Sequence, residues 1–187
     1  MRNTVIPLDL VFVGPDNRKG SKLVGDYLAK QLAAGDKVGI IEGVPTTTNA
    51  QQRTAGYKDA MDAAGMKIVS TQSGNWEIDQ GQKVASAMLS EYPDLKALLA
   101  GNDNMALGAV SAVRAAGKAG KVLVVGYDNI AAIKPMLQDG RVLATADQAA
   151  AQQAVFGIQN ALKLVKGEKV DAQDGVIETP VELVLKK

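Results

Sequence analysis

The sequence predicts an α/β fold, a doubly wound and mostly parallel open sheet in a three-layer α/β/α arrangement. Short, mostly apolar runs recur along the 187 residues, as in parallel strands that are buried on both faces. A helical pattern follows nearly every run, and this alternation is typical of repeated right-handed βαβ units. No linker rich in Pro, Gly or Ser divides the chain, so we expect a single lobe over residues 1–187.

Seven segments are predicted to be strands because each is a short run dominated by aliphatic residues. They cover residues 8–13, 37–41, 66–71, 96–100, 121–125, 141–146 and 181–185.

Helices are predicted between these strands, where apolar residues recur at intervals of three and four. The stripes lie within residues 23–32, 57–64, 84–89, 105–113, 130–137 and 151–165. Glycines that favour a helix end follow several of them, and Thr48 or Asn49 is expected to cap the second helix.

The composition excludes several kinds of chemistry. Histidine and cysteine are both absent, which rules out a Ser–His triad, a His-ligated metal and a thiolate nucleophile. Neither a Gly-x-Gly-x-x-Gly loop nor a Walker motif occurs, so no nucleotide cofactor is expected. A net charge of +1 gives no electrostatic case for nucleic acid. We therefore expect no metal and no cofactor.

No run of about 18 apolar residues is present, so no transmembrane helix is predicted. The first residues lack the long apolar region of a signal peptide. The chain is accordingly expected to be cytosolic, already processed, or cut from something longer.

Two turns place polar side chains at the carboxyl ends of neighbouring strands, the edge where open α/β sheets bind ligands. Asn102 and Asp103 follow the fourth predicted strand, and Asp128 follows the fifth. We expect Asn102 or Asp103 to cap a helix and the other to face a ligand. Amide and carboxylate groups suit a neutral polyhydroxyl ligand, although all these residues also fit as ordinary helix caps.

Three further residues are candidates for the same edge. Arg53 lies one turn into the second helix, Trp76 lies in the loop after the third strand, and Gln148 follows the sixth. A guanidinium offers several fixed donors, and an indole ring can cover the C–H face of a sugar. The alternatives are a solvated arginine, a tryptophan that anchors its loop, and a solvated glutamine.

These strings together resemble the C-terminal lobe of type I periplasmic binding proteins of the ribose-binding type, within the LacI-like superfamily. The resemblance rests on Arg53-Thr54-Ala55-Gly56-Tyr57, on 102–109, on Val125-Gly126-Tyr127-Asp128 and on 143–148. It implies a flavodoxin-like lobe that binds a monosaccharide, a ribose-like pentose or a hexose, and that is not an enzyme. It also implies an ABC-transporter permease as partner and a periplasmic location. The sugar contacts it implies are Arg53, Trp76, Asn102, Asp128 and Gln148.

Intact members of that family have two lobes, and this sequence resembles one. Residues 149–187 hold a helix and a strand that, in intact members, belong partly to the N-terminal lobe. We therefore expect weakened or lost sugar binding, and a homodimer through the apolar stripe of the helix at 151–166. The alternative is that this helix folds back onto its own sheet and leaves a monomer. A LacI-type transcription regulator is the alternative, but no helix-turn-helix or basic patch is present. A flavodoxin-like enzyme or signalling domain would need a phosphate loop or an acidic catalytic cluster.

Overall fold

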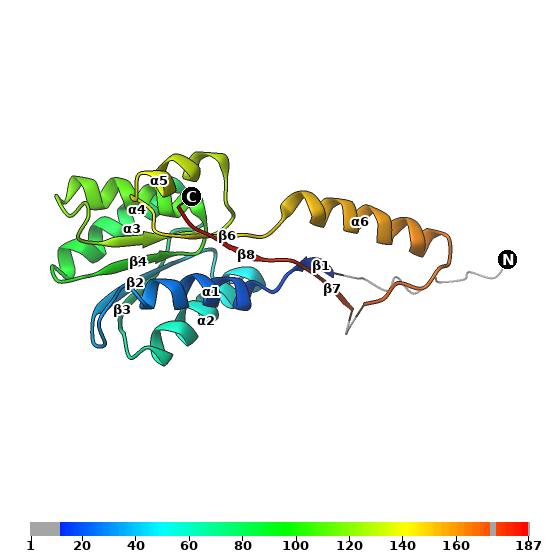
Figure 1. Cartoon of the computed structure of the whole chain (residues 1–187), viewed down its shortest axis with the longest axis horizontal. Helices are drawn as coiled ribbons and strands as arrows, with labels where there is room; N and C mark the ends of the chain where they lie inside the picture. The colour runs from blue at the N-terminus through cyan, green and yellow to red at the C-terminus, as the bar shows by residue number, and fades with distance from the viewer. Residues whose placement is uncertain (1–11, 173–174, 187) are drawn as a thin grey trace.

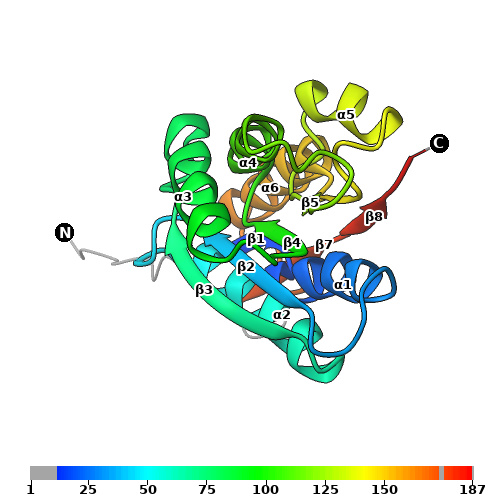
Figure 2. The same cartoon turned by 90° about the vertical axis from the view of Figure 1, so that its left-hand side faces the viewer.

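The computed structural model describes residues 12–172 and 175–186. It confirms the α/β class: parallel strands lie between a layer of two helices and a layer of three (Figures 1 and 2). The strands are β1 Phe12–Pro15, β2 Lys37–Glu42, β3 Lys67–Ser73, β4 Ala97–Ala100, β5 Leu123–Val125, β6 Thr145–Asp147, β7 Val176–Thr179 and β8 Glu182–Val184. The helices are α1 Asn17–Ala29, α2 Thr48–Ala63, α3 Ile78–Glu91, α4 Asp103–Ala115, α5 Lys134–Gln138 and α6 Ala150–Val165, with a 3-10 turn at Ala131–Ile133.

The main sheet has the strand order β3-β2-β4-β5, with all neighbours parallel. A parallel bridge between Val125 and Ala144 extends it toward β6, and β8 then pairs antiparallel with β6. The carboxyl ends of β2, β4 and β5 therefore reach the same edge as β6, which is where the polar turns were expected to meet.

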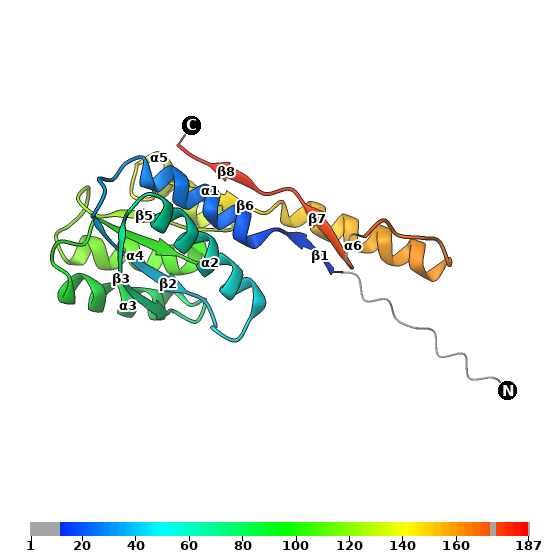
Figure 3. The same ribbon diagram turned by 90° about the horizontal axis from the view of Figure 1, so that it is seen from below.

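The first predicted strand differs from the structure. Residues 8–11 of that prediction lie outside the described residues. The described strand begins at Phe12 and pairs in parallel with β7, a strand that was not predicted, and not with the main sheet (Figure 3). The pairing joins segments more than 160 residues apart. Neither short segment has a periodic pattern from which the pairing could be predicted.

Two apolar clusters fill the space on either side of the sheet. Helices α1 and α2 cover one face, with Leu28 and Tyr57 fully buried. Helices α3, α4 and α5 cover the other face, with Met88 and Met105 fully buried. The core is thus complete around the main sheet without any help from α6.

Helix α6 projects from the rest of the lobe beside β1 and β7 (Figures 1 and 3). None of its residues is buried. Its predicted apolar stripe is in solvent: Val155, Ile158, Leu162 and Val165 are 49 %, 63 %, 55 % and 85 % exposed. Among the described residues, no helix combines the length and apolar character that a membrane span requires.

Candidate functional site

Arg53 is the centre of a polar cluster at the carboxyl edge of the sheet. The second turn of α2 carries it, and it is only 5 % exposed. Its Nε donates to Asn17 Oδ1 at 2.9 Å, and its Nη1 donates to the Gly101 carbonyl at 2.9 Å. The same Nη1 lies 3.2 Å from Asp128 Oδ1, and Nη2 lies 3.4 Å from Gln148 Oε1. The guanidinium thus links the start of α1 to the segments that follow β4, β5 and β6.

Asp128 is the anionic partner in this cluster. Its Oδ1 also accepts a hydrogen bond from Gln148 Nε2 at 2.7 Å. The residue has a φ of 116° and the next residue, Asn129, a φ of 55°, so the turn after β5 is backbone that L-residues rarely adopt. Burial raises the pKa of Asp128, and the nearby Arg53 charge opposes that rise. The turn therefore holds a desolvated carboxylate close to a fixed cation.

Two aromatic rings flank the guanidinium. The Arg53 Cζ lies 3.7 Å from the centre of the Tyr127 ring and 5.5 Å from the centre of the Trp76 ring. Tyr127 is fully buried, and its desolvation raises its pKa to about 12. Trp76 lies in its loop, where its ring occupies the space that a side chain at position 43 would need. Cation–π contacts of this kind are stronger when the cation is desolvated.

Asn102 joins the turn after β4 to the Trp76 loop. Its Oδ1 accepts from the Met105 amide at 2.9 Å, which caps α4, and its Nδ2 donates to the Trp76 carbonyl at 3.2 Å. Asn102 is therefore the cap that was predicted at this turn. The companion expectation is wrong, because Asp103 does not face outward: it is fully buried and bonded within the lobe. The capping of α2 is also different, since its N-cap is Thr47 and not Thr48 or Asn49.

The five predicted residues lie together in one region, linked directly or through one another. Their roles as ligand contacts stay a prediction. Sequence reasoning missed two of Arg53's partners, Asn17 and Tyr127. Asn17 is the first residue of α1, shortly after β1, and Tyr127 belongs to the Val125-Gly126-Tyr127-Asp128 turn. Both residues therefore follow the end of a strand, and that position could have marked them as candidates.

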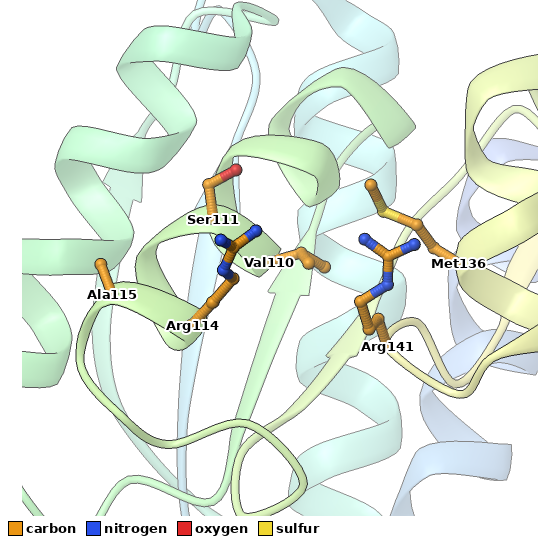
Figure 4. A pocket seen from close by; sticks show the side chains of 6 residues that line it. All are labelled: Val110, Ser111, Arg114, Ala115, Met136 and Arg141. Carbon is orange, nitrogen blue, oxygen red and sulfur yellow. The ribbon is translucent and has the colours of Figure 1, made fainter.

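Two other features of the lobe lie apart from this cluster. Within residues 12–172 and 175–186, no group of three or more carboxylates is placed to hold a metal ion. A hollow of about 390 Å³ lies between the end of α4 and α5 (Figure 4). Arg114 and Arg141 flank it, and Arg141 is already paired with Asp139 at 2.6 Å. None of the five cluster residues lines this hollow.

Comparison with known families gives one match that covers most of the chain. Residues 4–169 match the model of the family described as "Periplasmic binding protein domain".

Two curated relatives illustrate the similarity. The chain is 80 % identical over 174 residues to the D-ribose/D-allose-binding protein of Pseudomonas aeruginosa, which covers 92 % of this chain and 54 % of that protein. It is 36 % identical over 173 residues to the ribose import binding protein RbsB of Escherichia coli K12, covering 92 % and 56 %. The chain thus spans about half the length of these relatives.

Solved structures show the same fold. An ABC-transporter periplasmic solute-binding protein of Actinobacillus succinogenes, with bound D-allose, has a TM-score of 0.90 at 37 % identity. The match covers 96 % of this chain and 62 % of that one. An ABC-transporter solute-binding protein of Burkholderia multivorans has a TM-score of 0.87 at 74 % identity, covering 92 % and 60 %.

Proposed function

This chain belongs to the periplasmic binding protein family, and we propose that it carries one half of a monosaccharide site. The observation that supports this most directly is the Arg53–Asp128–Gln148 cluster at the carboxyl edge of the sheet. That edge is the general ligand side of open α/β folds. The family assignment makes a solute-binding role, and not catalysis, the expected activity.

The chemistry of the cluster suits a polyhydroxyl ligand. Each sugar hydroxyl can donate and accept hydrogen bonds, so it needs neighbours of both kinds. Arg53 supplies donors, Asp128 supplies acceptors, and the amide of Gln148 supplies both. Hydrogen bonds that involve ionised groups are the stronger ones. The Trp76 ring can cover the apolar C–H face of a pyranose or furanose.

The relatives suggest which sugar and which system. D-ribose and D-allose appear in the names of the relatives and the neighbouring structure, and we propose these two sugars as ligands. We also propose that the whole protein is periplasmic and delivers its sugar to the permease of an ABC transporter. The alternative of a transcription-regulator core gains no support from these relatives.

We expect this chain alone to bind sugar weakly or not measurably. Ligand sites usually bury about 70–90 % of a small ligand, and one lobe offers a single face. Titration calorimetry with D-ribose and with D-allose measures this directly. A sub-micromolar Kd in a confirmed monomer would contradict the proposal that this chain carries only half of the sugar site. Addition of the N-terminal half of the Pseudomonas aeruginosa relative is expected to strengthen binding.

The cluster itself is tested by NMR on the chain combined with that N-terminal half, with the Trp76 indole signal followed during sugar addition. Sugar is expected to shift that signal and the Gln148 side-chain amide. Gln148→Ala is expected to weaken binding at least fivefold, because it removes a donor and an acceptor. Gln31→Ala, at a position just after α1 and away from the cluster, is the matched control and should bind as the parent chain does. Binding that perturbs neither signal would overturn the assignment of the site.

A further inference from the structure

We propose that Asp103 is the positioning residue of this site: its buried carboxylate fixes the turn that holds Asp128 against Arg53. The proposal rests on the proposed function for its biological meaning, but its structural content stands on the contacts below. Asp103 touches no expected ligand position, since it is fully buried.

Asp103 is bonded to both ends of the strained turn. Its amide donates to the Tyr127 carbonyl at 2.7 Å, and its Oδ2 accepts from the Ile130 amide at 2.9 Å. Between these two anchors lie Asp128 and Asn129, the two residues of this turn with positive φ. Conformations of this kind cost about 1–3 kcal/mol and persist only where the surroundings enforce them. Asp103 supplies a large part of that enforcement.

The second carboxylate oxygen reaches the strand that carries Gln148. Asp103 Oδ1 accepts from the Thr145 hydroxyl at 2.8 Å, and Thr145 is itself fully buried. The Thr145 Oγ1 in turn lies 3.4 Å from the Asn129 amide. One carboxylate therefore sets both the turn after β5 and the start of β6. These are the two segments that bring Asp128 and Gln148 to Arg53.

The sequence around Asp103 is consistent with this role. A side chain at Gly126 would collide with Asp103 Oδ1, so glycine there leaves room for the carboxylate. Both oxygens accept from donors that cannot move far, and a neutral amide or hydroxyl has fewer acceptor sites than a carboxylate. The two hydrogen bonds therefore require a carboxylate at this position, and a side chain that only filled the same volume would not form them.

Protonation is expected to change the hydrogen bonds of this contact, while it removes the cost of burying the charge. A protonated carboxyl turns one acceptor into a donor, which then faces the Ile130 amide or the Thr145 hydroxyl. Burial raises the pKa of Asp103 to about 7, while the bonds from Ile130 and Thr145 oppose that rise. The ionisable group that acts on it is Asp128, which raises its pKa. The Tyr57 phenol of α2 is affected in turn: burial raises its pKa first, and the Asp103 charge adds to that rise. Beyond Asp128 lies the Arg53 cation.

The test uses the full chain and NMR between pH 5 and pH 8. We expect the Ile130 amide proton and the Asp128 side-chain carboxyl carbon to shift together, with a midpoint near pH 7. Asp103→Asn should abolish that shared transition and speed exchange of the Asp128 and Ile130 amides at least tenfold. Thr145→Val removes one donor and should raise the midpoint. Asp139→Asn, at an exposed carboxylate, is the control and should change neither.

Two results would overturn the proposal: an Ile130 amide that stays constant through this range, or a transition that survives Asp103→Asn. If Asp103→Asn fails to fold, the Thr145→Val midpoint decides, since an unchanged midpoint would also refute the contact. A general loss of packing would not move a titration midpoint selectively. None of these measurements uses a sugar, so absence of sugar binding would count against the proposed function and leave this result intact.

Discussion

At the scale of single residues, the burial of Arg53 makes its charge a structural requirement as well as a binding group. The side chain is almost entirely out of water, and its close anion is Asp128. Loss of one member of a buried ion pair leaves the other without compensation, and typically costs about 3–5 kcal/mol. Its remaining partners, Asn17, Gly101 and Gln148, would also lose a donor.

We therefore expect Arg53→Ala to lower the free energy of unfolding by about 3 kcal/mol. Arg18→Ala is the matched control, because Arg18 also pairs with an aspartate, Asp59 at 2.6 Å, but its side chain is 60 % exposed. Exposed pairs contribute about 0–1 kcal/mol. Urea unfolding of both variants measures the difference. Equal losses would show that Arg53 is not held as the structure has it.

Asp103 predicts a pH dependence of stability. Its folded pKa of about 7 lies above the value of 3.8 for a free carboxyl, so the folded state binds more protons in between. The contribution of Asp103 to the free energy of unfolding is fully present below about pH 4 and is lost as pH rises through 7. The chain has no histidine, which leaves few other groups that titrate in this range.

From pH 5 to pH 8 we expect the unfolding free energy of the parent chain to fall by about 2–3 kcal/mol relative to Asp103→Asn. Denaturant curves of both chains at both pH values give this difference. An increase with pH would mean that the carboxylate is better stabilised in the fold than in water.

The residues of the site that directly follow strands could be predicted from the sequence. Asn102, Asp128 and Gln148 follow strands whose carboxyl ends meet at one edge, so their meeting could be expected from chain order alone. The inward orientation of the Asp103 side chain could not be predicted in this way. Whether a carboxylate after a strand faces out or inward depends on contacts with Ile130 and Thr145, 27 and 42 residues further on.

At the scale of elements, the main sheet could be predicted and the ribbon of β1 and β7 could not. Strands β2, β4 and β5 are aliphatic runs within an α/β/α sandwich, which is the pattern that a sequence reveals most clearly. The edge strand β3 carries only Ile68 and Val69 as aliphatic residues. Strand β7 has the burial pattern of a mostly exposed segment, with only Thr179 buried, and it pairs far along the sequence. Short exposed strands of this kind carry little signal in composition.

Close packing of α3 against α4 gives a test at this scale. A Cβ at Gly108 would collide with the Ile78 carbonyl and the Gln82 amide. Overpacking typically costs about 1–3 kcal/mol, which exceeds the gain of about 1 kcal/mol from the better helix propensity of alanine. We expect Gly108→Ala to lower the melting temperature.

Gly157→Ala is the matched control for this packing argument. Gly157 lies within α6 and has open space around its Cα. There only the propensity gain remains, so we expect stability to rise by about 0.5–1 kcal/mol. A stabilising effect at Gly108 as well would show that the two helices are further apart than described.

At the scale of the whole molecule, the described core is formed without α6. The sequence-based alternative, in which this helix folds back onto its own sheet, is wrong, because no residue of α6 is buried. That residues 149–187 belong partly to a second lobe stays a prediction. It agrees with a helix that projects from the body and with relatives about twice as long.

The exposed stripe of α6 leads to the last prediction, a homodimer of this chain. Val155, Ile158, Leu162 and Val165 recur at helical spacing and lie in solvent. Full burial of each such side chain is worth about 1.5–3 kcal/mol, and large exposed apolar patches usually become interfaces. A second copy of the same stripe, related by a two-fold axis, covers it most simply.

Light scattering at tens of micromolar is expected to give twice the chain mass of 19.5 kDa. Ile158→Glu combined with Leu162→Glu should restore the monomer, because it places charges at the centre of the interface. Lys163→Glu changes a charge on the same helix but off the stripe, so it should leave the dimer in place. A monomer mass for the parent chain would refute the dimer, and the stripe would then remain exposed unless a separate N-terminal half covers it.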